Sequence, residues 1–169
     1  MKEIAKQWRM GYNNTKKIDH GGVHMAFLER SVIIQKPIDE VFATATDFSK
    51  SPEIMKTVIN VESLTEGPVR EGYQFKEVRE IRGRKSASII EVTSFEKDKS
   101  YSVRSAQHGI DLRYHYTFVE TTEGTKVEFK GELETLGLRN TLTKPLIKKI
   151  IKKEDANHLD KMKIFIEES

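Results

Sequence analysis

Residues 142–168 read LTKPLIKKIIKKEDANHLDKMKIFIEE, and this stretch decides the fold. At the period of an α-helix, its large apolar residues fall on one side and its lysines spread over the remainder. The apolar stripe consists of Ile147, Ile151, Leu159, Met162, Phe165 and Ile166. Thr143 is expected to cap this helix, and Pro145 suits its first turn, where a missing N–H costs nothing. The sequence therefore predicts one long amphipathic helix at the C-terminal end.

One residue interrupts the apolar stripe of this helix. Asp155 lies among its apolar positions, where a carboxylate needs a partner, water or a ligand. The stripe as a whole must be buried against another element, and no other stretch of the chain is a comparable helix. We therefore expect the long helix to pack on a sheet.

The middle of the chain supplies that sheet. Six segments have the pattern of strands: 58–64, 73–81, 86–95, 100–106, 110–120 and 125–135. Short turn signals such as Arg82-Gly83 and Glu123-Gly124 separate them, and connections this short between consecutive strands favour an antiparallel meander.

Two of these strands alternate between apolar and polar residues, which predicts one face buried under the helix. Leu112, Tyr114, Tyr116 and Phe118 share a face in the first, as do Val127, Phe129 and Leu133 in the second. A further strand at 26–35 precedes Pro37, which opens a short helix, and Pro52 opens a second short turn. The fold class is therefore α+β: a strand, two short helices and six strands forming a curved antiparallel sheet wrapped around the C-terminal helix.

The composition excludes several classes of protein. The chain has 169 residues, enough for one domain with a real core. The net charge of +3 arises from 29 basic and 26 acidic residues, which is too balanced to indicate nucleic-acid binding. The absence of cysteine excludes disulfides and thiolate chemistry. No apolar run approaches a membrane span, so we expect no stable membrane insertion and a cytoplasmic location.

The first 24 residues differ from the rest of the chain, because they are polar and show no sustained period. We expect residues 1–24 to form a poorly structured extension and residues 25–169 to form the domain. Residues 21–25, Gly-Gly-Val-His-Met, can be encoded so that a ribosome-binding sequence lies just ahead of an ATG codon. Our hypothesis is that natural translation begins at Met25.

Several short motifs occur in a recognisable order from Met25 to Glu168. They are Lys36-Pro37-Ile38-Asp39-Glu40-Val41-Phe42 with Asp47, Gly72-Tyr73-Gln74-Phe75-Lys76-Glu77, Glu91-Val92-Thr93-Ser94-Phe95, Tyr116-Thr117-Phe118 and Gly124-Thr125-Lys126-Val127. In order and spacing the chain resembles the START-like helix-grip (SRPBCC) superfamily, which includes Bet v 1-like proteins and polyketide cyclase/dehydrase and lipid transport proteins. It departs from the cyclase-like branch at 52–55, where Pro-Glu-Ile-Met replaces a segment that often holds tryptophan.

The resemblance implies an apolar cavity between the sheet and the long helix. Residues expected to line it are Tyr73, Phe75, Glu77, Arg79, Ile90, Tyr101, Val103, Leu112, Tyr114, Tyr116, Phe118, Phe129, Asp155, Leu159 and Met162. Their aromatic surface and hydroxyls suit a ring-bearing or acyl ligand. The alternative is that these side chains simply fill a solid core.

Three of the expected lining residues are ionisable. Alternation from Tyr73 and Phe75 places Glu77 and Arg79 on the same strand face, and Asp155 joins them from the helix. Together they could orient or protonate a ligand, or they could be an ordinary ion pair and an exposed carboxylate. The histidines show no metal-ligand spacing and are read as surface residues, so no metal and no cofactor is expected.

Three functions are consistent with this pattern. The first is a protein that binds or carries a small hydrophobic molecule, a lipid or an aromatic or polyketide-like metabolite, without transforming it. The second is a polyketide cyclase/dehydrase-like enzyme in which Glu77, Arg79 or Asp155 moves protons. The third is a protein-interaction module without a ligand, and the oligomeric state stays open.

Overall fold

The computed structural model describes residues 26–81 and 83–169, and its centre is a seven-stranded antiparallel sheet with the order β1-β7-β6-β5-β4-β3-β2. The strands are β1 (Leu28–Ile34), β2 (Val58–Ser63), β3 (Gln74–Ile81), β4 (Arg84–Glu96), β5 (Ser100–Gln107), β6 (Ile110–Thr121) and β7 (Gly124–Thr135). All neighbouring strands pair antiparallel, and consecutive strands from β2 to β7 are adjacent. The predicted meander is therefore confirmed, and β1 closes it by pairing with β7.

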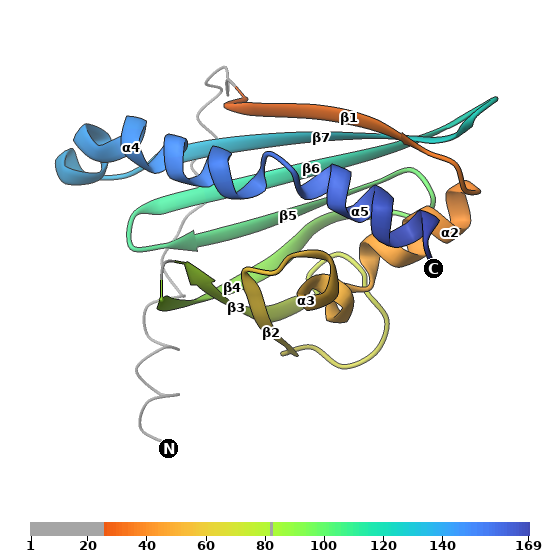
Figure 1. The fold of residues 1–169 in the computed structure, drawn as a ribbon. Helices are drawn as coiled ribbons and strands as arrows, with labels where there is room; N and C mark the ends of the chain where they lie inside the picture. Colours follow the sequence, from red (N-terminus) through yellow and green to blue (C-terminus); the bar gives the residue numbers. More distant parts are fainter. Residues whose placement is uncertain (1–25, 82) are drawn as a thin grey trace.

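Helices cover one face of the sheet. They are α2 (Ile38–Thr46), the short 3-10 helix η1 (Phe48–Lys50), α3 (Ser51–Ile54), α4 (Leu138–Asp155) and α5 (His158–Glu167). Figure 1 shows α4 and α5 running one after the other across the face of the curved sheet, with α2 and α3 near the end where α5 lies. The helix-grip fold predicted from the sequence is confirmed.

The alternation predicted for β6 and β7 decides which side of the sheet is inside. Tyr116, Phe118, Val127 and Phe129 are all buried, whereas Thr117 between the first two is exposed. Leu159, Met162 and Ile166 of α5 pack against this face, each at most 3% exposed. Burial of these apolar side chains holds the C-terminal segment to the sheet.

The C-terminal helix is confirmed, with 28 residues in two segments, but its predicted start is wrong. α4 begins at Leu138, so Thr143 is not its cap and Pro145 lies in its interior. The cap position is Gly137, whose φ of 87° is readily adopted only by glycine. Pro145 has no N–H to donate to the carbonyl of Thr141, and the structure accommodates this gap within a continuous helix.

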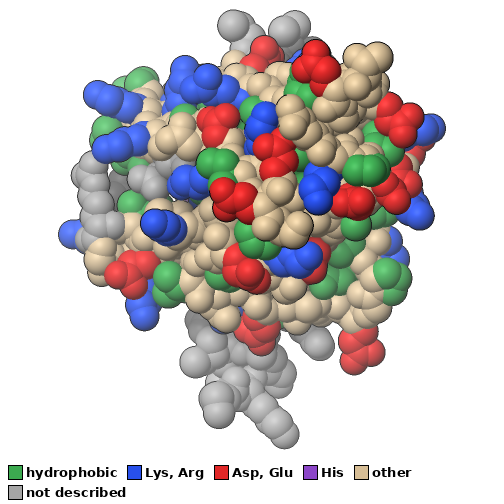
Figure 2. Space-filling model, turned by 45° about the vertical axis from the view of Figure 1, so that its right-hand side comes forward, with side chains coloured by type: hydrophobic (Ala, Val, Ile, Leu, Met, Phe, Trp, Pro, Cys, Tyr) green, Lys and Arg blue, Asp and Glu red, His purple; other side chains and the backbone are tan. Residues whose placement is uncertain are grey.

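The exterior of the molecule is heavily charged, as the 33% of charged residues requires. On the face seen in Figure 2, acidic and basic side chains alternate with small areas of hydrophobic side chains. None of the described helices is long and apolar enough to cross a membrane. The predicted extension, residues 1–24, lies outside the described residues.

Candidate functional site

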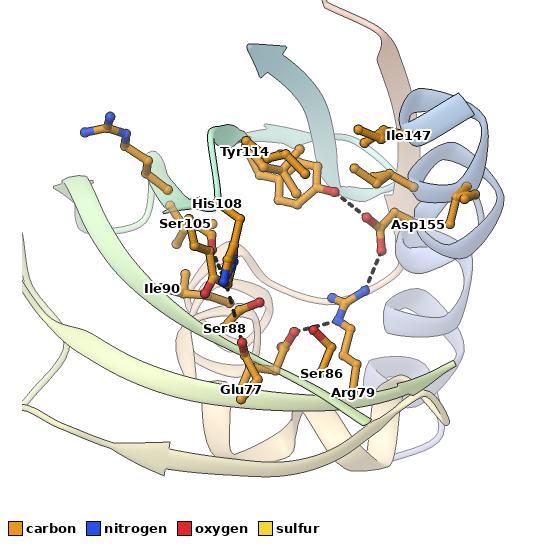
Figure 3. Close-up of a pocket in the computed structure, with 18 of the residues that line it drawn as sticks. Glu77, Arg79, Ser86, Ser88, Ile90, Ser105, His108, Tyr114, Ile147 and Asp155 are labelled. Atoms are coloured by element: carbon orange, nitrogen blue, oxygen red, sulfur yellow. Dashed lines mark hydrogen bonds and ion pairs between the residues drawn. The ribbon is translucent and has the colours of Figure 1, made fainter. Parts of the chain in front are cut away.

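A cavity of about 390 Å³ lies between α4 and the inner faces of β3, β4, β5 and β6. Its surface is mostly apolar, with aliphatic side chains from Ile81, Ile90, Val103, Ile110, Leu112, Ile147, Ile150 and Ile151, and Ser86, Ser88, Ser105, Gln107 and His108 add polar groups. Ile147 and Ile151 of α4 line the cavity opposite the strands, as Figure 3 shows for Ile147, whereas Ile150 at its border is 44% exposed. Its volume falls within the range of small-molecule sites, about 300–1,000 Å³.

A network of four polar side chains forms one wall of this cavity. Arg79 lies between two carboxylates: its Nε is 2.6 Å from Oε1 of Glu77, and its Nη1 is 2.8 Å from Oδ1 of Asp155. Tyr114 donates its hydroxyl hydrogen to the other oxygen of Asp155, Oδ2. Figure 3 shows the chain of contacts from Tyr114 through Asp155 and Arg79 to Glu77. Glu77 and Asp155 are only 7% and 5% exposed, so the network lies inside the protein.

The local sequence explains how these four residues meet. Glu77 and Arg79 are two residues apart on β3 and therefore share its inner face. Asp155 is the last residue of α4, at the point where the C-terminal helix is interrupted before α5. Tyr114 pairs with Gly131 across β6 and β7, and a Cβ at Gly131 would lie 3.0 Å from the Tyr114 ring. The glycine thus leaves room for the ring that reaches Asp155.

The electrostatics of the network keep Arg79 and Tyr114 in defined protonation states. Burial alone would lower the pKa of Arg79, but the charges of Glu77 and Asp155 and their hydrogen bonds raise it overall, so the guanidinium stays charged. Burial raises the pKa of Tyr114 well above its usual range, and the Asp155 carboxylate raises it further. Tyr114 is therefore a permanent donor, and both oxygens of Asp155 accept hydrogen bonds.

A second, smaller cavity of about 90 Å³ lies on the other side of this network. His158 lines it, and its ring centroid is 5.9 Å from that of Tyr116 and 5.9 Å from that of Phe129. Burial lowers the pKa of His158 to about 4; Asp155 opposes this shift, while Arg79 and Lys161 add to it. The imidazole is therefore neutral at pH 7.

Aromatic side chains fill the part of the interior beyond the small cavity. Tyr101 stacks on Tyr116 with ring centroids 4.5 Å apart, and Phe48 stacks on Phe75 at 4.3 Å. Phe42 of α2 meets the edge of Phe118 at 5.1 Å. Rings from α2 and η1 thus pack into the hollow of the sheet, and an open groove of about 770 Å³ runs along their outer side.

Comparison with sequence models of protein families shows to which family the chain belongs. A sequence model of the family described as "Polyketide cyclase / dehydrase and lipid transport" matches residues 25–164. The chain belongs to this family. The predicted START-like (SRPBCC) relationship is thereby confirmed, and no curated protein matches the chain.

Solved structures similar to this family member share its fold at low sequence identity. An aromatase/cyclase, Zhui from Streptomyces sp. R1128, has a TM-score of 0.69 at 13% identity over 83% of this chain and 92% of its own. Ara h 8.0201 has a TM-score of 0.67 at 13% identity, over 84% and 97%. A START superfamily protein from Mycobacterium smegmatis has a TM-score of 0.61 at 16% identity, over 80% and 92%. At such identities the similarity is one of fold alone.

The structure of this polyketide cyclase/lipid transport family member brings about half of the predicted lining residues to the larger cavity. These are Glu77, Arg79, Ile90, Val103, Leu112, Tyr114 and Asp155. The smaller cavity adds Phe75, Tyr101, Tyr116, Phe129 and Met162. The remaining three border neither space: Phe118 and Leu159 are buried in the core, and the hydroxyl of Tyr73 donates to Oγ of Ser63.

Some cavity residues were not predicted from the sequence. Ile147 and Ile151 belong to the apolar stripe of the helix but were not named as lining residues. His158 was read as a surface histidine, which is wrong, because its ring packs against Tyr116 and Phe129. Its place one helical turn after Asp155 was the signal that could have placed it inside.

No metal site accompanies the cavity within residues 26–81 and 83–169, where no three histidine, aspartate or glutamate side chains could hold an ion together. The cavity offers shape, aliphatic surface, one charged network and a few further polar side chains such as Ser88 and Gln107. Such a site can enclose an apolar molecule and orient it through a small number of polar contacts.

Proposed function

We propose that this chain is a cytoplasmic protein that binds or carries a small hydrophobic molecule, a lipid or an aromatic or polyketide-like metabolite, in the cavity under α4. The observation that carries this proposal is the aliphatic space of about 390 Å³, bounded on one side by the network of Glu77, Arg79, Asp155 and Tyr114. An apolar ligand that leaves water and fills a space of this size with apolar walls lowers the free energy of the system, so binding is favourable. The family and the similar structures fit this function.

The second candidate is a polyketide cyclase/dehydrase-like enzyme, and the same network is the observation that favours it. A general acid or base must exchange a proton within hydrogen-bond reach of the substrate. Arg79 is held in its charged form, and Asp155 is engaged at both oxygens. Glu77 is engaged only at Oε1 by a side chain of the described structure, so it is the residue of the three best placed to move a proton.

The test of the binding function starts from protein purified from its natural host. Native mass spectrometry should show a small molecule that co-purifies with the protein and is released on denaturation. A panel of lipids and polyketide-like aromatics should then contain members that raise the melting temperature, since a ligand that binds only the folded state stabilises it. A product that differs in mass from the added ligand would favour the enzyme.

Paired variants of neighbouring residues show whether binding takes place in this cavity. Ile90 lines the cavity, whereas Ile89 beside it is 40% exposed on the outer face of β4. Ile90→Trp should fill the space and abolish the shift in melting temperature, and Ile89→Trp should leave it unchanged. Ser88→Phe fills the same cavity from another position and serves if Ile90→Trp does not fold. Binding that survives both cavity variants would contradict the proposal.

A further inference from the structure

The composition of the cavity wall restricts the chemistry of the ligand that the proposed binding function requires. Taking that function as the basis, we infer that the ligand has a largely aliphatic body and a head group that donates hydrogen bonds, an amine or a hydroxyl, which meets Glu77. Two features of the wall point to such a ligand: the unequal number of acidic and basic groups in the network, and the scarcity of rings.

The charged groups facing the cavity do not balance. Glu77 and Asp155 contribute two carboxylates, and Arg79 contributes the single guanidinium between them. Arg104 also borders the space, but its guanidinium is bound to Asp111 at 2.6–3.1 Å. His158 is neutral behind the network, and so the buried group carries an excess of one acidic function. Both carboxylates pair with Arg79, so one guanidinium balances two acidic groups, and a donor from the ligand would add a favourable contact in a largely apolar space.

Glu77 is the place where such a donor can bind. Both oxygens of Asp155 are already occupied, one by Arg79 and one by Tyr114. Oε1 of Glu77 accepts from Arg79, whereas no side chain or backbone group of the described residues donates to Oε2. Glu77 borders the cavity and is nearly buried, so a ligand group is the natural partner for this second oxygen.

The rest of the wall selects the body of the ligand. Around the cavity, the described residues supply only two rings, Tyr114 and His108, and the phenol of Tyr114 is already bound to Asp155. The phenylalanines and other tyrosines of the interior lie beyond the network, around the smaller cavity and in the core, where they pack on one another. A flat aromatic ligand would find little ring surface to stack on, whereas an alkyl chain matches the isoleucines of α4 and the strands.

A competing arrangement would place a carboxylate head group outward, toward the lysines of α4. Lys149, Lys152 and Lys153 are exposed on that helix and could attract an anion at the surface. The alkyl tail would then lie against Glu77 and leave its oxygen without a donor. Affinities of ligands that differ only in the head group distinguish this arrangement from the inferred one.

The experiment compares decylamine, decanol and decanoic acid at pH 7, each below its micelle concentration, by titration calorimetry with the full chain. Decylamine should bind at least about tenfold tighter than decanoic acid, which corresponds to removing one unfavourable charge contact. Glu77→Gln should weaken decylamine by about tenfold and change decanol by less than about threefold. Glu80→Gln, on the exposed face of the same strand, should change none of the three affinities.

The outcomes separate the inferred head group from the binding function on which it rests. Decanoic acid binding as tightly as decylamine, or decylamine binding that Glu77→Gln leaves unchanged, would overturn the inferred head group. If Ile90→Trp still abolished that binding, the cavity would remain a ligand site with a different preference. If none of the three compounds bound, and no molecule accompanied the native protein, both the inferred head group and the proposed function would fail.

Discussion

His158 shows at the scale of one residue how its neighbours set the state of a side chain. It begins α5, and its ring lies against Tyr116 and Phe129 on the far side of the charged network. Burial holds its pKa near 4, so the folded protein keeps a neutral imidazole at a pH where an unfolded chain binds a proton. The sequence around His158 carries no metal or catalytic pattern, and only the helical spacing from Asp155 indicates an inward position.

This pKa predicts a loss of stability in mild acid. The folded pKa is lower than the unfolded value of 6.5, so between pH 6.5 and 4 the unfolded state binds more protons and the free energy of unfolding falls as the pH falls. The loss should reach about 3 kcal/mol near pH 4 and then level off. In His158→Phe this contribution is absent. The difference in unfolding free energy between the variant and the unchanged protein should therefore shift by about 3 kcal/mol in favour of the variant as the pH falls from 6.5 to 4.

Chemical denaturation at a series of pH values measures both curves. His115 on the outer side of the sheet provides the control, since its ring bonds to Ser102 and lies near Glu132 at the surface. His115→Gln should leave the pH dependence assigned to His158 in place. Parallel curves for the natural sequence and His158→Phe would show that His158 is not the group responsible.

At the scale of elements, the start of α4 is fastened to a neighbouring turn. Nδ2 of Asn140 donates to the carbonyl of His108 at 2.9 Å and to that of Leu136 at 3.0 Å. The N–H of Leu136 in turn donates to the carbonyl of Gly109. Gly109 has φ 73°, and a Cβ there would lie 2.4 Å from Nδ2 of Asn140, so the turn needs glycine. These contacts hold the N-terminal end of α4, the helix that covers the cavity.

Removing this fastening should loosen α4 without unfolding the sheet. Asn140→Ala deletes two hydrogen bonds, each contributing about 0.5–1.5 kcal/mol. Amide hydrogen exchange in α4 should therefore become about tenfold faster, while β5, β6 and β7 keep their protection. Lys149→Ala changes an exposed side chain of the same helix and should leave its exchange rates nearly unchanged. Equal acceleration in the sheet would show that Asn140 stabilises the whole fold instead.

The start of α4 also shows why sequence patterns locate elements better than their ends. The apolar stripe and the strand alternation indicated the order of the elements, because each reflects the burial of one face. Thr143 and Pro145 gave a familiar start signal, but Gly137 and the contact of Asn140 with the β5–β6 turn place the first residue earlier. That contact joins residues far apart in sequence, so no local pattern could reveal it.

At the scale of the whole molecule, the interior is divided into a filled part and a hollow part. The sequence indicated that aromatic residues face inward, but not that Phe42 and Phe48 from the short helices would occupy the space beside Phe118 and Phe75. Phe118 therefore lies in the core, other rings of the expected lining border the smaller cavity, and Ile147 and Ile151 of α4 border the larger one. Packing between elements decides which side chains fill the hollow of a curved sheet, and the periodicity within one strand does not predict that packing.

This division predicts that the same substitution has two different costs. Leu159 is 2% exposed in the filled part, so Leu159→Ala should lower the free energy of unfolding by about 3–4 kcal/mol through lost contacts and a new cavity. Leu112 borders the existing cavity and is only partly buried, so Leu112→Ala should cost about 1–2 kcal/mol. Urea unfolding with unchanged m-values measures both losses on one scale. Equal costs would mean that the space under α4 is filled in solution, and the ligand-binding proposal would then lose its physical basis.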